Sequence, residues 1–306
     1  MTTISTQTRT NVELIIHEVD VLCKGVRFPK RKSKLGRPPI YTDKFILKLV
    51  ILQYLLGFTS ERSYLRFLKN LDYPLFTKLP DNSRYNRRAK SLKPLIEKLT
   101  IRIFKELKVE KSKIRVIDTT PVPVIRYARA KRRKIFTDKT EVSIGYCASQ
   151  KTYYCGVKLN LLVNQNGIPC VHSLIAANHH DLIGAKQIIR EQNLKGLVLI
   201  GDKGYLMKGG EKNELKQKRL IQLVTPFRRN QKEKNNKKEK RLLRMRKIIE
   251  TVNSQLKDQM GLERLRAKSY QGLTSRIDNL IFTYLFGVYF NKLTGRNPLS
   301  LKSILT

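Results

Sequence analysis

The fold is decided by residues 152–176, which read TYYCGVKLNLLVNQNGIPCVHSLIA. Residues 152–164 are rich in β-branched and aromatic side chains, and residues 168–176 are similar after the polar turn at 165–167. An Asn-Gly pair between two such runs is a strong signal of a β-hairpin. We therefore predict two antiparallel strands here.

Further apolar runs on both sides of the hairpin extend the predicted sheet. The other strands are 114–118 (IRVID), 197–201 (LVLIG) and 221–225, and the helices are 181–192, 211–219, 237–259 and 273–293. Antiparallel strands followed by βα units predict a mixed sheet with helices on its faces. The fold class is therefore α/β over residues 111–306.

The first 110 residues have a helical pattern instead. Predicted helix starts are Thr42 with Asp43, then Thr59-Ser60-Glu61, then Asp81 or Ser83, and finally Pro94. Ser, Thr and Asp are preferred N-caps, and proline is tolerated in the first helical turn. Three or four short helices predict a small helix-turn-helix-like, all-α domain over 1–110.

The charge of the chain points to a polyanionic partner. Among 306 residues there are 63 Lys and Arg against 24 Asp and Glu, a formal charge of +39. Nucleic acid is the first candidate and an anionic membrane the second. No apolar run reaches the roughly 18 residues of a membrane span, and no signal-peptide pattern is present. We expect a cytoplasmic, nucleoid-associated protein without a membrane partner.

The basic residues gather in three runs, 24–37, 126–134 and 226–247. Such runs are often only solvated surface, but three of them favour several contacts along one polyanion. In the third predicted helix, Arg84, Arg87 and Arg88 share one face. That pattern is typical of a recognition helix on DNA, the alternative being an ordinary basic helix.

Three carboxylates occupy positions that fit metal chemistry. Asp118 ends the predicted strand 114–118, Asp202 follows the strand 197–201, and Glu250 lies in a helix. Ligands collect at the carboxyl ends of strands, and converging carboxylates need cations between them. Oxygen ligands select Mg²⁺ or Mn²⁺, and two such ions can clamp an in-line phosphoryl transfer. Each aspartate alone is more often a turn or cap residue.

The helix around Glu250 has an apolar stripe and a polar edge. The stripe is Leu242, Met245, Ile249, Val252 and Leu256, and the edge is Arg246, Glu250, Asn253 and Lys257. The stripe predicts packing on the sheet. The alternative for the edge is a surface ion pair between Arg246 and Glu250.

Three blocks of the sequence together resemble a known family. IDTTP at 117–121, GDKGY at 201–205 and the spacing Arg246-x3-Glu250-x6-Lys257 are similar to the blocks of the DDE transposases of bacterial insertion sequences. The resemblance covers roughly residues 110–295. It implies a ribonuclease-H-like fold, with two Mg²⁺ or Mn²⁺ ions held by Asp118, Asp202 and Glu250 as catalytic residues.

The resemblance also implies the partners and the reaction. The protein would cleave transposon ends and transfer the strand into target DNA, acting on double-stranded DNA with terminal inverted repeats. It would be a homodimer or larger in the synaptic complex. Arg246 and Lys257 would contact the transposon-end phosphates, and we add Lys203 and Asn253 to the expected DNA contacts. The alternatives are an inactive DNA-binding regulator or decayed element product, and a structure-selective nuclease on the same fold.

Two smaller features remain open. Asp181, after two histidines, is most simply a helix N-cap, although a His-Asp pair can also bind metal or assist proton transfer. Tyr153 and Tyr154 lie on a strand, so one should be buried and the other outside. The outer tyrosine is a candidate for stacking on DNA, with ordinary sheet packing as the alternative.

Overall fold

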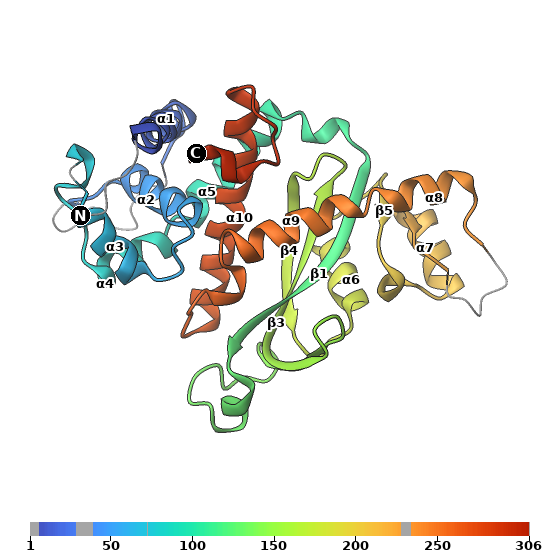
Figure 1. Ribbon diagram of the computed structural model, residues 1–306. Coiled ribbons are helices and arrows are strands. Elements are labelled where there is room, and N and C mark those ends of the chain that lie inside the picture. The colour runs from blue at the N-terminus through green and yellow to red at the C-terminus, as the bar shows by residue number, and fades with distance from the viewer. Residues whose placement is uncertain (1–5, 29–38, 72, 228–233, 306) are drawn as a thin grey trace. The chain divides into compact units, whose positions relative to one another are not determined.

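The computed structural model describes residues 6–28, 39–71, 73–227 and 234–305 (Figure 1). The chain forms two compact units: one contains 1–107, 255–267 and 271–306, and the other contains 108–254 and 268–270. The first junction lies beside our predicted boundary at 110. Most of 255–306, which we had assigned to the catalytic domain, groups instead with the N-terminal helices.

The first unit is all helical. Its helices are α1 (Thr6–Cys23), α2 (Asp43–Leu55), α3 (Glu61–Lys69), α4 (Asn82–Lys90), α5 (Lys93–Glu106) and most of α10 (Tyr270–Leu293), with 3-10 turns η1 (Pro74–Phe76), η5 (Leu262–Arg264) and η6 (Leu301–Ile304). Helix α1 was not predicted, although Val12, Ile15, Val19 and Leu22 recur at helical spacing and are buried. Among the helices within the described ranges, none is long and apolar enough to cross a membrane.

The predicted starts of α2 to α5 are confirmed. The side chains of Thr42, Ser60 and Asp81 each accept a hydrogen bond from the backbone N–H three residues later. Pro94 lies in the first turn of α5. Each cap satisfies a helix-end donor that has no partner within the helix, and this explains why the helices begin at these residues.

The second unit is built on a curled mixed sheet. Its strands are β1 (Ile114–Ile125), β2 (Ser143–Cys147), β3 (Thr152–Asn164), β4 (Pro169–Ala176), β5 (Val198–Ile200) and β6 (Gln222–Val224). They lie in the order β4-β3-β1-β5-β6, and β2 shares with β4 the edge of β3 opposite β1. β3 runs antiparallel to its neighbours, whereas β1, β5 and β6 are parallel. The predicted mixed α/β sheet with helices on its faces is confirmed, with β2 as an additional strand.

Strand β1 is longer than predicted. Asp118 lies inside the strand and pairs with Leu161 of β3, so our placement of Asp118 at a strand end was wrong. Pro121 and Pro123 lie within the strand, although proline cannot donate to a ladder. β5 pairs only with the first three residues of β1, so both prolines can turn their missing N–H toward an open edge.

The helices of this unit are α6 (Asp181–Glu191), α7 (Gly209–Arg219), α8 (Lys237–Arg244) and α9 (Lys247–Asp258), joined by 3-10 turns η2 (Val109–Lys111), η3 (Tyr127–Arg132) and η4 (Lys203–Tyr205). The predicted helix 237–259 is therefore two helices. The backbone N–H groups of Met245 and Arg246 each bond the carbonyl three residues back, which tightens the chain between α8 and α9.

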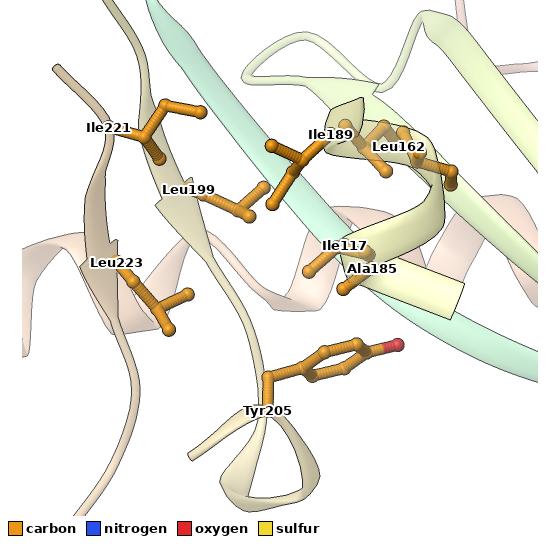
Figure 2. Close-up of a cluster of buried hydrophobic side chains, with 9 residues drawn as sticks. Ile117, Leu162, Ala185, Ile189, Leu199, Tyr205, Ile221 and Leu223 are labelled. Atoms are coloured by element: carbon orange, nitrogen blue, oxygen red, sulfur yellow. The ribbon is translucent and has the colours of Figure 1, made fainter. Parts of the chain in front are cut away.

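Helix α6 covers one face of the sheet. Ile117, Leu162, Leu199 and Leu223 from four strands meet α6 in a buried apolar cluster (Figure 2). Because successive strand residues point to opposite faces, Ile117 in this cluster directs Asp118 toward the other face. Helix α9 contacts that face, as the hydrogen bond from α9 to Asp118 described below shows.

Candidate active site

The strand register brings Asp118 and Asp202 together. Val116 of β1 is paired with Ile200 of the parallel strand β5, and the two aspartates each lie two residues further along. Equal steps along parallel neighbours lead to the same level and the same face of a sheet. The charge of Asp202 accordingly contributes to raising the pKa of Asp118.

The GDKGY segment shapes the turn that holds Asp202. The Asp202 carboxylate caps η4 and accepts a hydrogen bond of 2.7 Å from the Gly204 N–H. A Cβ at Gly204 would lie 2.9 Å from the same Asp202 oxygen, and a Cβ at Gly201 would lie 2.8 Å from the Tyr205 ring. Both contacts are too short, so a side chain at either position would force the Asp202 carboxylate or the Tyr205 ring to shift.

Asp118 is held by a neighbour from helix α9. Asn253 is buried and its Nδ2 donates a hydrogen bond of 2.8 Å to Asp118 Oδ2. Burial raises the pKa of Asp118 to about 6, and the nearby Asp202 acts in the same direction. The Thr119 backbone N–H, the Arg246 guanidinium and the Asn253 amide oppose the shift. The carboxylate is therefore costly to ionise in the protein alone, and a cation would stabilise it.

The donor set near Asp118 suits a hard metal ion. Asp118 and Asp202 supply carboxylate oxygens, and Asn253 Oδ1 is buried without a hydrogen-bond partner. Oxygen ligands of these types are the ones that Mg²⁺ and Mn²⁺ prefer. The chemistry of these residues thus fits the expected cofactor, although the described residues contain no group of three or more His, Cys, Asp or Glu side chains placed around one metal position.

Arg246 immediately precedes helix α9, and Glu250 lies in the first turn of that helix. The Glu250 side chain is 61% exposed, and Arg246 Nη2 lies 3.9 Å from Glu250 Oε1. Such a long, exposed ion pair contributes little. Arg246 also acts electrostatically on Asp118. The structure therefore groups Asp118, Asp202, Asn253 and Arg246, with Glu250 three residues before Asn253 on α9 but turned to solvent.

A second polar network supports the site from the α6 face. Thr119 Oγ1 donates to Asn160 Oδ1 at 2.9 Å and lies 2.6 Å from Tyr205 Oη. Tyr205 is buried, and burial together with the charges of Asp118, Asp181 and Asp202 raises its pKa. We missed Thr119 and Asn160 from the sequence. The available signal was position, since Thr119 follows Asp118 and must face α6 with Ile117.

The prediction for Asp181 was wrong by one residue. His180 is the N-cap of α6, where its Nδ1 accepts from the Leu182 N–H, and Asp181 is the first helical residue. The Asp181 carboxylate instead forms an ion pair of 2.9 Å with Lys158 Nζ. The Lys158 ammonium also donates to the His179 carbonyl oxygen.

The predicted DNA-contacting residues have varied surroundings. Lys203 is exposed in η4, and Lys257 forms an ion pair of 3.2 Å with Glu263. In helix α4, Arg84 and Arg87 are exposed, whereas Arg88 is half-buried and paired with Asp43 at 2.6 Å. Arg88 thus ties α4 to the start of α2.

The three basic runs are described to different extents. Most of the run 24–37 and part of the run 226–247 lie outside the described residues. The run 126–134 is described throughout and lies on η3 and its flanks.

Comparisons with known proteins identify the family of this chain. The transposase DDE domain family matches residues 108–270, more than half of the chain. The chain therefore belongs to this family of transposases, which are enzymes that act on DNA and generally use divalent metals. A comparison with curated proteins gives no match.

One solved structure has a similar fold, a piggyBac transposase in a synaptic complex with hairpin DNA. The match has a TM-score of 0.49 and 11% sequence identity, and covers 99% of this chain and 76% of that one.

Proposed function

We propose that the protein catalyses metal-dependent cleavage at transposon ends and transfer of the freed strand into target DNA. The observation that supports the proposal is the pairing of Val116 in β1 with Ile200 in β5, two residues before Asp118 and Asp202 respectively. Hydrolysis of a phosphodiester at the transposon end would release a 3′-hydroxyl. That hydroxyl would then displace the 3′-oxygen of a target phosphodiester, so one P–O bond forms as another breaks.

Asp118 and Asp202 would hold two Mg²⁺ or Mn²⁺ ions, with Glu250 as the third carboxylate. Bound ions would polarise the scissile phosphate and activate its attacker. Asn253 lies one helical turn from Glu250 and already contacts Asp118. Its place on the same side of α9 as Glu250 supports the assignment of Glu250.

The chain's own residues would orient this chemistry. We assign Asn253 to holding the Asp118 carboxylate, in place of the DNA contact suggested by the sequence. Arg246 would remain beside the carboxylates and, with Lys203 and Lys257, meet the phosphates of the transposon end.

The helical unit would bind the terminal inverted repeat. Arg84 and Arg87 are exposed on one face of α4 and are available for phosphates or base edges. We propose double-stranded transposon ends and target DNA as partners, and a homodimer or larger assembly to bring two ends together. The setting would be a bacterial insertion sequence acting at the nucleoid.

One observation favours a second candidate, an inactive DNA-binding regulator or decayed element product. Glu250 is exposed and is not gathered with the two aspartates in the described part of the chain. Such a protein would bind transposon ends but neither cleave nor join them. A structure-selective nuclease would cleave without joining.

The test is a strand-transfer assay with labelled transposon ends, target plasmid and Mg²⁺. We expect joined products with the wild type and none with Asp202→Asn, while end binding is retained. Glu214→Gln removes an exposed carboxylate that pairs with Lys218 on α7, and this variant should join ends normally. Cleavage without joining would identify the nuclease, and binding without cleavage would identify the regulator.

A further inference from the structure

Three exposed tyrosines lie together on the sheet unit, with the central ring in contact with the other two. Tyr127, Tyr146 and Tyr153 are 50%, 50% and 58% exposed, and we call them the tyrosine cluster. The Tyr153 and Tyr127 rings are nearly parallel, with centroids 5.6 Å apart and an interplanar angle of 22°. The Tyr146 ring lies 5.0 Å from Tyr153 at 56°. Grouped aromatic rings left open to solvent mark a binding surface more often than a core.

The backbone holds two of these rings in place. Tyr146 of β2 is directly paired with Tyr153 of β3 in an antiparallel ladder. Tyr154 points to the opposite face, where it is buried with Cys147 and Ala177. The expected alternation is confirmed, and Tyr153 is the outer residue.

The third ring is held by the segment after β1. Tyr127 begins η3, and this segment is anchored by Arg133, which donates to the Val142 carbonyl at 2.9 Å and to Cys155 Sγ at 3.0 Å. Ala130 in the middle of η3 is buried. The cluster is therefore a pre-formed surface built from three separate stretches of chain.

The tyrosine cluster lies beside strong positive charge. The exposed basic side chains of the same segment are Arg126, Arg129, Lys131, Arg132 and Lys134. None of them forms an ion pair with any residue that the structure describes. The cations are thus free to meet an anionic backbone that runs past the tyrosines.

From these observations we infer that the tyrosine cluster and its basic segment bind single-stranded DNA, with unpaired bases stacked on the rings. A positive surface that follows the phosphates, combined with aromatic rings that stack on bases, is the usual design for single strands. Duplex DNA hides its base faces within its own stack, so it offers the rings only base edges and backbone. An anionic membrane surface is the competing partner for aromatic and basic residues, and the test separates it.

The inference rests on the proposed function only for the choice of DNA. Single-strand binding is measured without cleavage or joining, so the two proposals fail separately. Tyrosine-dependent binding by a protein that never joins ends would remove the proposed function and keep this surface. Normal joining of ends without tyrosine-dependent binding would support the proposed function and contradict the inference about this surface.

The experiment measures equilibrium binding of the full chain to three probes by fluorescence anisotropy. The probes are a single-stranded oligothymidylate, an abasic oligomer of the same length and charge, and a duplex. Stacking of one base contributes about 1 to 3 kcal/mol, so the wild type should prefer the oligothymidylate to the abasic oligomer by about 5-fold or more. Equal binding of these two probes would overturn the inference.

The variants isolate the ring from the charge. Tyr153→Ala should lose about 5-fold or more in affinity for the oligothymidylate and little for the abasic oligomer, whereas Tyr153→Phe should keep the wild-type preference. Arg129→Ala should lower the affinity for the oligothymidylate and for the abasic oligomer by the same factor. Tyr127 lies outside the sheet, so Tyr127→Ala can be used for the same binding comparison if Tyr153→Ala unfolds. Equal losses on both oligomers in the tyrosine variants would contradict stacking.

A vesicle assay decides the competing partner. Binding to phosphatidylserine vesicles is measured beside the oligothymidylate for the wild type and Tyr127→Ala. We expect the tyrosine substitution to lower DNA binding selectively. A variant that loses vesicle binding while it binds the oligothymidylate normally would assign the surface to a membrane and remove single-stranded DNA.

Discussion

The two ends of strand β1 are built in opposite ways. Near its start, Asp118 is half-buried, hydrogen-bonded to Asn253 and close enough to Asp202 for the charges to interact. Just beyond its end, Tyr127 joins exposed aromatic rings next to unpaired basic side chains. One region withdraws charge from water and the other displays charge and rings to it. The difference indicates that catalysis and DNA binding depend on different regions. A carboxylate site needs a fixed geometry, whereas a surface that binds a DNA strand needs to be accessible.

The largest expected effect separates these two regions by activity. Asp118→Asn should reduce strand transfer by at least about 1,000-fold, because removal of one member of a catalytic set commonly costs that much. Its affinity for single-stranded oligothymidylate should stay within about twofold of the wild type. Tyr153→Ala should instead lose more in oligothymidylate affinity than in strand transfer. A parallel loss of binding and transfer in both variants would contradict the separation.

The next effect concerns stability and pH. The pKa of Asp118 is raised from 3.8 to about 6 in the folded protein, so its contribution to stability is greatest below pH 4 and is lost as pH rises through about 6. Asp118→Asn avoids this loss. In EDTA at pH 7 it should raise the free energy of unfolding by at most about 3 kcal/mol, the equivalent of a two-unit pKa difference.

Urea unfolding at pH 4 and pH 7 measures this difference. The gain from Asp118→Asn should be near its maximum at pH 7 and small at pH 4, where the wild-type carboxyl is protonated in the folded state and only partly ionised in the unfolded state. Asp138→Asn is the contrasting control: Asp138 is exposed and hydrogen bonds from Thr140 lower its pKa, so this substitution should not stabilise the protein at pH 7. A wild type as stable as Asp118→Asn at pH 7 would contradict the cost of ionising the buried carboxyl.

A smaller effect tests how Asp118 is oriented. Asn253→Ala removes the 2.8 Å hydrogen bond to the carboxylate and should lower strand transfer about 10- to 100-fold, as substitution of residues that orient ligands commonly does. The loss should shrink when the Mg²⁺ or Mn²⁺ concentration is raised. Thr251→Ala, an exposed position on the same helix, is the control. Full activity of Asn253→Ala at low metal would remove Asn253 from this role.

The sequence predicted the sheet better than it predicted the site. Periodicity and the Asn-Gly turn located the hairpin β3–β4 and the parallel strands β1, β5 and β6, because these patterns depend on neighbours along the chain. Asp118 and Asp202 were found from the same local signals, despite the longer β1. The hydrogen bond between Asn253 and Asp118 joins residues 135 positions apart. No local pattern reports such a contact, and helix position alone suggested a DNA contact for Asn253.

The tyrosine cluster was also only partly predictable from local sequence patterns. Alternation along β3 predicted that one of Tyr153 and Tyr154 lies outside, and the structure identifies Tyr153. Strand β2 and the segment 127–132 were not predicted, so their tyrosines could not be joined to it. A short strand with glycine at its centre has little β-propensity of its own. Strand β2 is stabilised by its pairing with β3, which a local sequence pattern does not predict.

The smallest expected effect asks whether the tyrosine cluster serves stability at all. An exposed aromatic pair contributes about 0.5 to 1.5 kcal/mol beyond area burial. A double-mutant cycle of Tyr127→Ala and Tyr153→Ala, measured by urea unfolding, should therefore give a coupling free energy of about 1 kcal/mol or less. In the presence of saturating oligothymidylate the cycle should show a larger coupling, since one stacked strand engages both rings. Single substitutions that each cost several kcal/mol without DNA would identify the cluster as part of the core, and the contrast with the carboxylate region would then be one of packing alone.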